Sequence, residues 1–158
     1  MILKYPEKMY YWYMEENLEK RHCSMLIPYY FKDGELYVFL QRRSADAPRN
    51  PNSLGGFGGG LEGEENNEEA LLREMQEELE YTPLNYSLLG TFETYHSVSN
   101  YYIEEVDKNF EKIITINEGK GGEWNKAKEA IERNDISPNT KKVVQNMLKT
   151  LEARPKEF

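Results

Sequence analysis

Cysteine is almost absent from this sequence, since Cys23 is the one cysteine among 158 residues. It cannot form an internal disulfide, which suits a reducing compartment, and we expect a small buried side chain there rather than a nucleophile. Long apolar runs are absent too, and Glu7, Glu15 and Glu16 interrupt the N-terminal region where a signal peptide would be apolar. The sequence therefore predicts a cytoplasmic protein with no membrane association.

Positive charge is also scarce: 20 lysines and arginines face 28 aspartates and glutamates, for a net charge of −8. This balance argues against a duplex nucleic acid as the partner. The length predicts a single domain over 1–158 with its own core. Residues 1–20 read as an aromatic-rich extension around Tyr10–Tyr13, which we expect to pack on the body, to line a base pocket or to lie in a homodimer interface.

The most informative stretch is 55–81, where a glycine-rich run leads directly into an acidic helix. Asn66 is a good N-cap and Glu69 follows three residues later, as in a capping box, so we predict a helix over Asn67–Leu79. At 100° per residue one arc of this helix is apolar. That arc consists of Leu71, Leu72, Met75 and Leu79.

Three carboxylates, Glu74, Glu77 and Glu78, share another sector of the helix, with Ala70 as the only other residue there. Like charges at this spacing cost about 0.2–0.5 kcal/mol per pair, so a helix selected for stability alone would interleave basic residues. Clustered carboxylates suit a hard cation such as Mg²⁺, which also binds substrate phosphates. The alternative is an acidic, solvated helix face.

Glycines at 55, 56, 58, 59 and 60 surround Phe57. Glycine lets the backbone approach a ligand or metal closely, so we predict a close-approach loop over Gly55–Gly60 rather than a linker. Phe57 is a candidate substrate contact within that loop.

The spacing in this region resembles the Nudix box. Gly59 is followed after five residues by Glu65, and after seven more by Arg73-Glu74-Met75-Gln76-Glu77-Glu78. The final Gly of the family pattern is Glu80 here, and the aliphatic residue after it is Tyr81. That Gly normally ends the helix in a left-handed conformation, so its replacement predicts that the helix continues a little further.

The resemblance implies an α/β/α sandwich around a mixed sheet and hydrolysis of a nucleoside diphosphate linked to another group X. It implies Mg²⁺, with Mn²⁺ as a substitute, bound by Glu74, Glu77, Glu78, a further carboxylate and the carbonyl of Gly58. Arg73 would orient the carboxylates, and Glu65 would support the loop or act on the attacking water.

Other segments are similar to the MutT-type subgroup. Arg42-Arg43 ends a predicted strand before a polar loop over 44–56, and by resemblance Arg43 contacts the base, with Arg42 as a second candidate substrate contact. Glu118 precedes a second glycine-rich loop that ends in Gly122-Glu123-Trp124, and it would be a further metal ligand or general base. Asn139, near the start of the last helix, is the candidate contact for a guanine edge.

The remaining patterns place these residues on a sheet with flanking helices. Alternating apolar residues predict strands over 24–31, 36–41, 84–94, 98–106 and 113–116, with Asp33-Gly34 in a tight hairpin turn. We predict a short helix over 126–133 and a last helix capped by Ser137 with Pro138 at its first position. His22 and His96 read as surface residues, and Trp124 as part of the core.

These features favour a MutT-like enzyme that converts a nucleoside triphosphate, with oxidised dGTP as one candidate, to the monophosphate and pyrophosphate. Gly55-Gly56 stands where that subgroup carries bulkier residues, so nucleotide sugars and ADP-ribose stay open as substrates. A nucleotide sensor that no longer hydrolyses is a second hypothesis, although the intact carboxylates argue against it. An RNA 5′-end pyrophosphohydrolase would need a basic track that the net charge disfavours.

Overall fold

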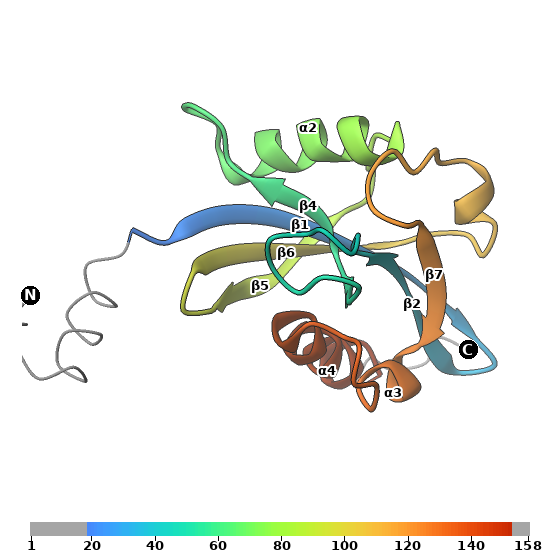
Figure 1. Cartoon of the computed structure of the whole chain (residues 1–158). Coiled ribbons are helices and arrows are strands. Elements are labelled where there is room, and N and C mark those ends of the chain that lie inside the picture. Colours follow the sequence, from blue (N-terminus) through green and yellow to red (C-terminus); the bar gives the residue numbers. More distant parts are fainter. Residues whose placement is uncertain (1–18, 153–158) are drawn as a thin grey trace, which may run out of the picture.

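The computed structural model describes residues 19–152, so the aromatic cluster Tyr10–Tyr13 lies outside the described part. A seven-stranded mixed sheet forms the middle layer, with helix α2 (Asn67–Leu79) on one face and helices α3 (Ala127–Ala130) and α4 (Pro138–Glu152) on the other (Figure 1). The predicted α/β/α sandwich is confirmed.

Strands β1 (Arg21–Lys32) and β2 (Glu35–Arg42) form the predicted antiparallel hairpin. Asp33 and Gly34 both have positive φ values, 52° and 76°, as a two-residue turn of this kind requires. The hairpin carries Arg42 to the end of β2, beside strand β3 (Leu54–Gly55).

The sheet order is β3-β2-β1-β6-β5, with β4 (Phe57–Gly60) paired to β1 and β7 (Gly122–Lys126) paired to β2. Strand β6 (Ser97–Glu105) runs parallel to β1 and antiparallel to β5 (Ser87–Glu93). The predicted loop over Gly55–Gly60 is therefore wrong in detail, because four of these residues form β4, antiparallel to β1.

The strand predicted over 113–116 is also wrong. A 3₁₀ turn (Phe110–Lys112) and a loop occupy this region, and the loop bonds to the end of α2 instead of to a strand. The Thr115 amide donates to the Leu79 carbonyl at 3.0 Å, and the Asn117 amide donates to the Glu78 carbonyl at 2.8 Å. The last carbonyls of a helix have no partner within the helix, and at the end of α2 they bind the segment that leads to Glu118.

Helix α2 begins as predicted, with the Asn66 side chain accepting from the Glu69 amide at 2.8 Å. It also ends at Leu79, so the predicted continuation is wrong. Glu80 adopts the left-handed conformation (φ 50°, ψ 44°) that a glycine would normally take, and the amides of Glu80 and Tyr81 cap the helix by donating to Gln76 and Met75. A non-glycine residue there costs about 1 kcal/mol.

Two apolar clusters hold the layers together. One packs β1, β2 and β6 against α3 and α4, and includes Val143, Val144, Met147 and Leu151 of α4. The other packs α2 against the opposite face of the sheet, with Phe39, Phe57 and Phe110 at its centre.

Helix α3 spans four residues instead of the predicted eight. Within residues 19–152 no helix is long and apolar enough to span a membrane.

Candidate active site

The glycines of β4 bring the backbone against carboxylates of α2. The Gly58 amide donates to Glu78 Oε2 at 2.9 Å. A Cβ added at Gly59 would lie 2.6 Å from Glu74 Oε1, so no larger residue fits without moving that carboxylate. Gly58 itself has a φ of 141°, which L side chains rarely adopt. Position 59 therefore needs glycine so that Glu74 can approach the strand, and position 58 needs it because of its φ and because a Cβ there would lie 2.0 Å from the Ser24 carbonyl oxygen.

Arg73 forms hydrogen bonds with three of the carboxylates in this region. Its Nε donates to both oxygens of Glu65 at 2.9 and 3.1 Å, and Nη1 donates to Glu74 at 3.0 Å and Glu77 at 3.2 Å. Nη2 donates to the Gly60 carbonyl at 3.0 Å. The bond to Glu65 raises the pKa of the guanidinium most, and the same bond lowers the pKa of Glu65. One arginine thus ties the helix, the loop before it and β4 together.

Glu78 lies deepest, with 4% of its surface exposed. Burial raises its pKa to about 10, and a hydrogen bond with Glu118 and the charges of Glu118 and Glu74 act in the same direction. Burial also raises the pKa of Glu74. Glu77 differs, because its side chain is 59% exposed and pairs with Arg73. Glu74, Glu78 and Glu118 are therefore brought together, with Glu77 at the edge.

These residues fit a hard divalent cation by their chemistry, since every donor is an oxygen and no lysine or arginine within residues 19–152 pairs with Glu78. Over the same residues, no three His, Cys, Asp or Glu side chains already stand in a metal-binding arrangement. A cation would therefore draw the side chains of Glu74, Glu78 and Glu118 together and would offset the cost of burying their charge.

The loop of Glu118 is fixed by its backbone. Gln41 Nε2 donates to the Glu118 carbonyl at 3.1 Å, and the Lys120 amide donates to the Arg42 carbonyl at 2.8 Å. Gly119 has a φ of 74°, and a Cβ there would meet that same carbonyl at 2.6 Å. The glycine signal in the sequence thus marks a real close approach, but to β2 rather than to a ligand.

Two predicted substrate contacts, Phe57 and Arg42, have protein partners in the structure. The ring of Phe57 is fully buried and stacks on Phe39 at 5.6 Å, so it lies in the core and not in a substrate pocket. Arg42 is held by Glu123 at 2.6 Å and by Asp135 at 2.8 Å. The bond from Arg133 and then the bond from Arg42 hold the pKa of the Asp135 carboxyl well below its usual range.

Arg43 and Asn139, which 96 positions separate in the sequence, both interact with Tyr101. Asn139 and Thr140 both form hydrogen bonds with the side chain of Tyr101. Burial raises the pKa of Tyr101 to about 12, and the charge of Arg43 acts in the opposite direction. The Nε of Arg43 donates a hydrogen bond to the Arg49 carbonyl at 2.9 Å. Asn139 Oδ1 is buried without a hydrogen-bond partner in the structure.

Sequence reasoning missed Tyr101 and Asp135. The sequence pattern places Tyr101 in a strand and gives it no role, because the parallel pairing of β1 and β6 that brings it beside Gly56 is not encoded in local patterns. Asp135 carries no sequence signal at all. Two other expectations are confirmed: Cys23 is buried, and Trp124 packs against Phe39 and Tyr30 with ring centroids 5.1 and 4.5 Å apart.

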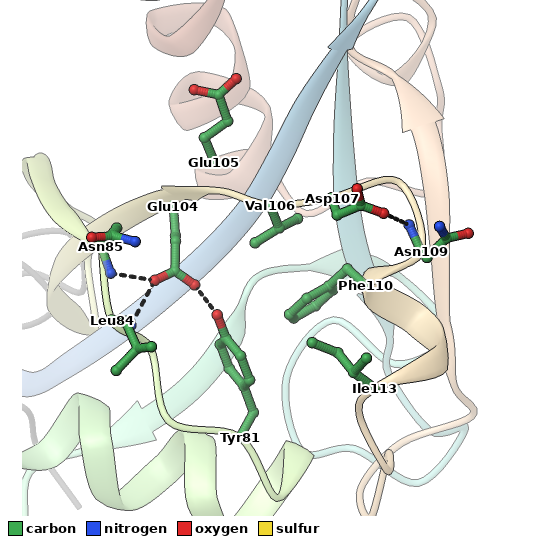
Figure 2. A pocket seen from close by; sticks show the side chains of 10 residues that line it. All are labelled: Tyr81, Leu84, Asn85, Glu104, Glu105, Val106, Asp107, Asn109, Phe110 and Ile113. Atoms are coloured by element: carbon green, nitrogen blue, oxygen red, sulfur yellow. Dashed lines mark hydrogen bonds between the residues drawn. The ribbon is translucent and has the colours of Figure 1, made fainter.

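A cavity of about 330 Å³ lies elsewhere, between the end of α2, the end of β6 and the 3₁₀ turn (Figure 2). None of the predicted site residues lines it. On its wall Tyr81 donates a hydrogen bond to the buried carboxylate of Glu104, which also accepts from the amides of Leu84 at 2.9 Å and Asn85 at 2.8 Å. This network anchors the chain where it leaves the left-handed Glu80.

Comparison with known families decides the classification, because the NUDIX domain model matches residues 20–147. The chain belongs to the Nudix family. No curated protein matches the chain.

Solved structures share this Nudix fold at low sequence identity. The Nudix domain of Shewanella oneidensis NrtR, complexed with ADP ribose, has a TM-score of 0.68 at 16% identity, with 94% of each chain covered. The MutT protein of Methanosarcina mazei Go1 has a TM-score of 0.66 at 16% identity, over 84% of this chain and 96% of that one. A C. elegans Ap4A hydrolase has a TM-score of 0.65 at 16% identity, over 85% and 99%. These similarities establish the fold alone.

Proposed function

We propose that this Nudix protein is a Mg²⁺-dependent pyrophosphohydrolase that cleaves a nucleoside diphosphate linked to X, with a nucleoside triphosphate as substrate and the monophosphate and pyrophosphate as products. The observation that carries the proposal is the cluster of Glu74, Glu78 and Glu118 against the Gly58 backbone, with Arg73 tied to the carboxylates around it. A site that only bound a nucleotide would not need three carboxylates this near one another.

In this proposal Glu74, Glu78 and Glu118 hold Mg²⁺ or Mn²⁺ together with the carbonyl of Gly58, and Glu77 adds to the negative field. The bound cation supplies charge neutralisation at the phosphate oxygens and lowers the pKa of the attacking water. Arg73 fixes the carboxylate positions through its five hydrogen bonds to side chains and one to the Gly60 carbonyl.

The candidate general bases differ in their surroundings. Glu65 is bound by Arg73 through both oxygens, which lowers its pKa and makes it a weak base. The pKa of Glu74 is raised by burial, so it accepts a proton more readily. Glu74 and Glu118 are metal ligands in this proposal, and a bound cation would keep them ionised. We therefore assign Glu65 to holding Arg73 and the loop.

The base would lie where Arg43, Tyr101 and Asn139 meet. The unpartnered Oδ1 of Asn139 offers an acceptor to an N–H on the edge of a purine, and the Arg43 Nη groups offer donors. This supports a purine nucleoside triphosphate, with oxidised dGTP as the sanitation candidate. ADP-ribose is the second candidate, because the NrtR Nudix domain of the same fold was solved with that ligand.

The test is release of pyrophosphate and phosphate with Mg²⁺ from oxidised dGTP, the ordinary nucleoside triphosphates, ADP-ribose and nucleotide sugars. Glu78→Gln should abolish turnover, while Glu80→Gln, the same change at an exposed position two residues away, should not. Cleavage of ADP-ribose alone would keep the enzyme and replace the substrate. No cleavage in the presence of tight nucleotide binding would indicate a sensor.

A further inference from the structure

Arg21 is a cation beside the glycine strand to which neither the sequence pattern nor the family match assigns a role. Its guanidinium lies against Gly60, where a Cβ would meet Nε at 2.5 Å and Nη2 at 2.8 Å. The other side of the same residue is held by Arg73, which bonds the Gly60 carbonyl at 3.0 Å. Gly60 therefore lies between two guanidinium groups, and a side chain at this position would displace that of Arg21.

Arg21 lies on the same face of the sheet as the proposed base pocket. Side chains alternate along a strand, so residues 21, 23 and 25 of β1 share a face. Met25 packs in the cluster against α4 and pairs with Tyr101, which belongs to that cluster too. From Met25 to Arg21 the strand rises about 13 Å, at about 3.3 Å per residue.

A stretch of strand without side chains lies between Tyr101 and Arg21. Strand β4 pairs Gly58 with Met25 and Gly60 with Cys23, so it runs from the level of Tyr101 towards Arg21 without a side chain beyond Phe57, whose ring faces the other way into the core. A Cβ on Gly56 would already meet the Tyr101 ring at 3.3 Å. An extended ligand could follow this strand with its base end at Tyr101 and its other end at Arg21.

The excess of negative charge at the site favours an additional cation that binds the substrate phosphates. Five carboxylates, Glu65, Glu74, Glu77, Glu78 and Glu118, lie on the α2 side of β4. Arg73 pairs with three of them, and Arg42 pairs with Glu123 and Asp135 instead. Within residues 19–152 no acceptor occupies the side chain of Arg21, which is exposed and has all its donors available. Arginine binds phosphate through paired hydrogen bonds.

We propose that Arg21 binds the outer phosphate of the substrate and so selects a substrate in which X is phosphate over one in which X is a neutral sugar. This rests on the proposed function, and it narrows the substrate class to nucleoside triphosphates. Arg21 would act in binding rather than in the chemical step, because it lies beyond Gly60 from the carboxylates.

The experiment compares Arg21→Ala with Lys32→Ala, which removes an exposed cation at the opposite end of the same strand. For the nucleoside triphosphate that the wild type cleaves best, Arg21→Ala should raise KM about tenfold or more with kcat within twofold. KM for a nucleotide sugar should not change. Arg21→Lys should recover part of the loss, and Lys32→Ala should match the wild type.

A binding measurement provides a second readout. Calorimetry with a nucleoside triphosphate and the matching monophosphate in EDTA should show that Arg21→Ala weakens the triphosphate about tenfold and leaves the monophosphate unchanged. Gly60→Ala, which keeps the charge but displaces the guanidinium, should weaken the triphosphate in the same sense. It serves also as the test if Arg21→Ala does not fold.

The outcomes separate the two proposals. If the wild type hydrolyses triphosphates and Arg21→Ala leaves KM and binding unchanged, or weakens the monophosphate and sugar equally, the role of Arg21 is refuted and the enzyme assignment stands. If the wild type neither cleaves nor binds nucleotides, the proposed function fails and the role of Arg21 fails with it.

Discussion

Replacing Glu78 with glutamine should make the stability of the metal-free protein less dependent on pH. Glu78 is 4% exposed and bonded to the Gly58 amide at 2.9 Å. Burial first, then the hydrogen bond with Glu118 and the charges of Glu118 and Glu74, raise its pKa from 4.5 to about 10. The carboxyl is therefore neutral in the folded metal-free protein over a pH range where the unfolded chain carries it ionised.

The sign and size of the effect follow from proton linkage. Between pH 4.5 and 10 the folded protein binds a proton on Glu78 that the unfolded chain has released, so rising pH favours unfolding. The slope is at most about 1.4 kcal/mol per pH unit. From pH 6 to 8 the wild type should lose up to about 2.7 kcal/mol through this group. That loss corresponds to about 5–10 °C in Tm for a chain of this length.

Urea unfolding in EDTA at pH 6, 7 and 8 measures the effect in wild type, Glu78→Gln and the exposed control Glu80→Gln. The slope of unfolding free energy against pH should be flatter in Glu78→Gln alone. Added Mg²⁺ should restore wild-type stability at pH 8, because a cation binds the ionised carboxylate, and it should affect Glu78→Gln little. Equal slopes for all three proteins in EDTA would refute the burial argument.

Three further predictions concern other positions. Arg43→Ala should raise KM for the preferred nucleotide about tenfold with little change in kcat, since a contact common to ground and transition states is lost; steady-state kinetics that show an unchanged KM would remove Arg43 from the base pocket. Glu80→Gly should raise the unfolding free energy by about 1 kcal/mol, because glycine adopts the left-handed conformation without strain and the change removes a negative charge from the C-terminus of a helix. Thermal unfolding that gives a lower Tm than the wild type would contradict this. Arg42→Ala should destabilise the fold by about 1–2 kcal/mol, because two ion pairs to half-exposed carboxylates, Glu123 and Asp135, are lost at up to about 1 kcal/mol each. Asp135→Asn should cost less. Thermal unfolding of both variants decides, and a neutral Arg42→Ala would return that residue to the list of substrate contacts.

The sequence alone was sufficient for the parts of this protein that depend on local patterns. Asn66 with Glu69 predicts where α2 begins, and the structure begins the helix at the predicted residue, because capping and 3.6-residue periodicity act within a few residues. Asp33-Gly34 likewise predicts the hairpin. The Nudix spacing predicts the family and the fold, since it encodes the loop and helix that hold the carboxylates.

Other features depended on which distant segments meet. The loop over 113–116 has the apolar alternation of a strand, but the end of α2 binds its amides. Phe57 lies in a glycine run that suggests a ligand site, yet its side of β4 faces the core. Arg42 and Arg43 are neighbours of identical type, and only the positions of Glu123 and Asp135 make one a structural ion pair.

The tertiary structure also decided what lies around the candidate site. The parallel pairing of β1 with β6 brings Tyr101 beside Gly56, and the antiparallel pairing of β1 with β4 brings Arg21 onto Gly60. Pairing between strands far apart in the chain follows from how the whole sheet buries its two faces, and no local pattern encodes it. The carboxylates could thus be predicted from their spacing on one helix, while the cations and the aromatic ring around them depended on the assembled sheet.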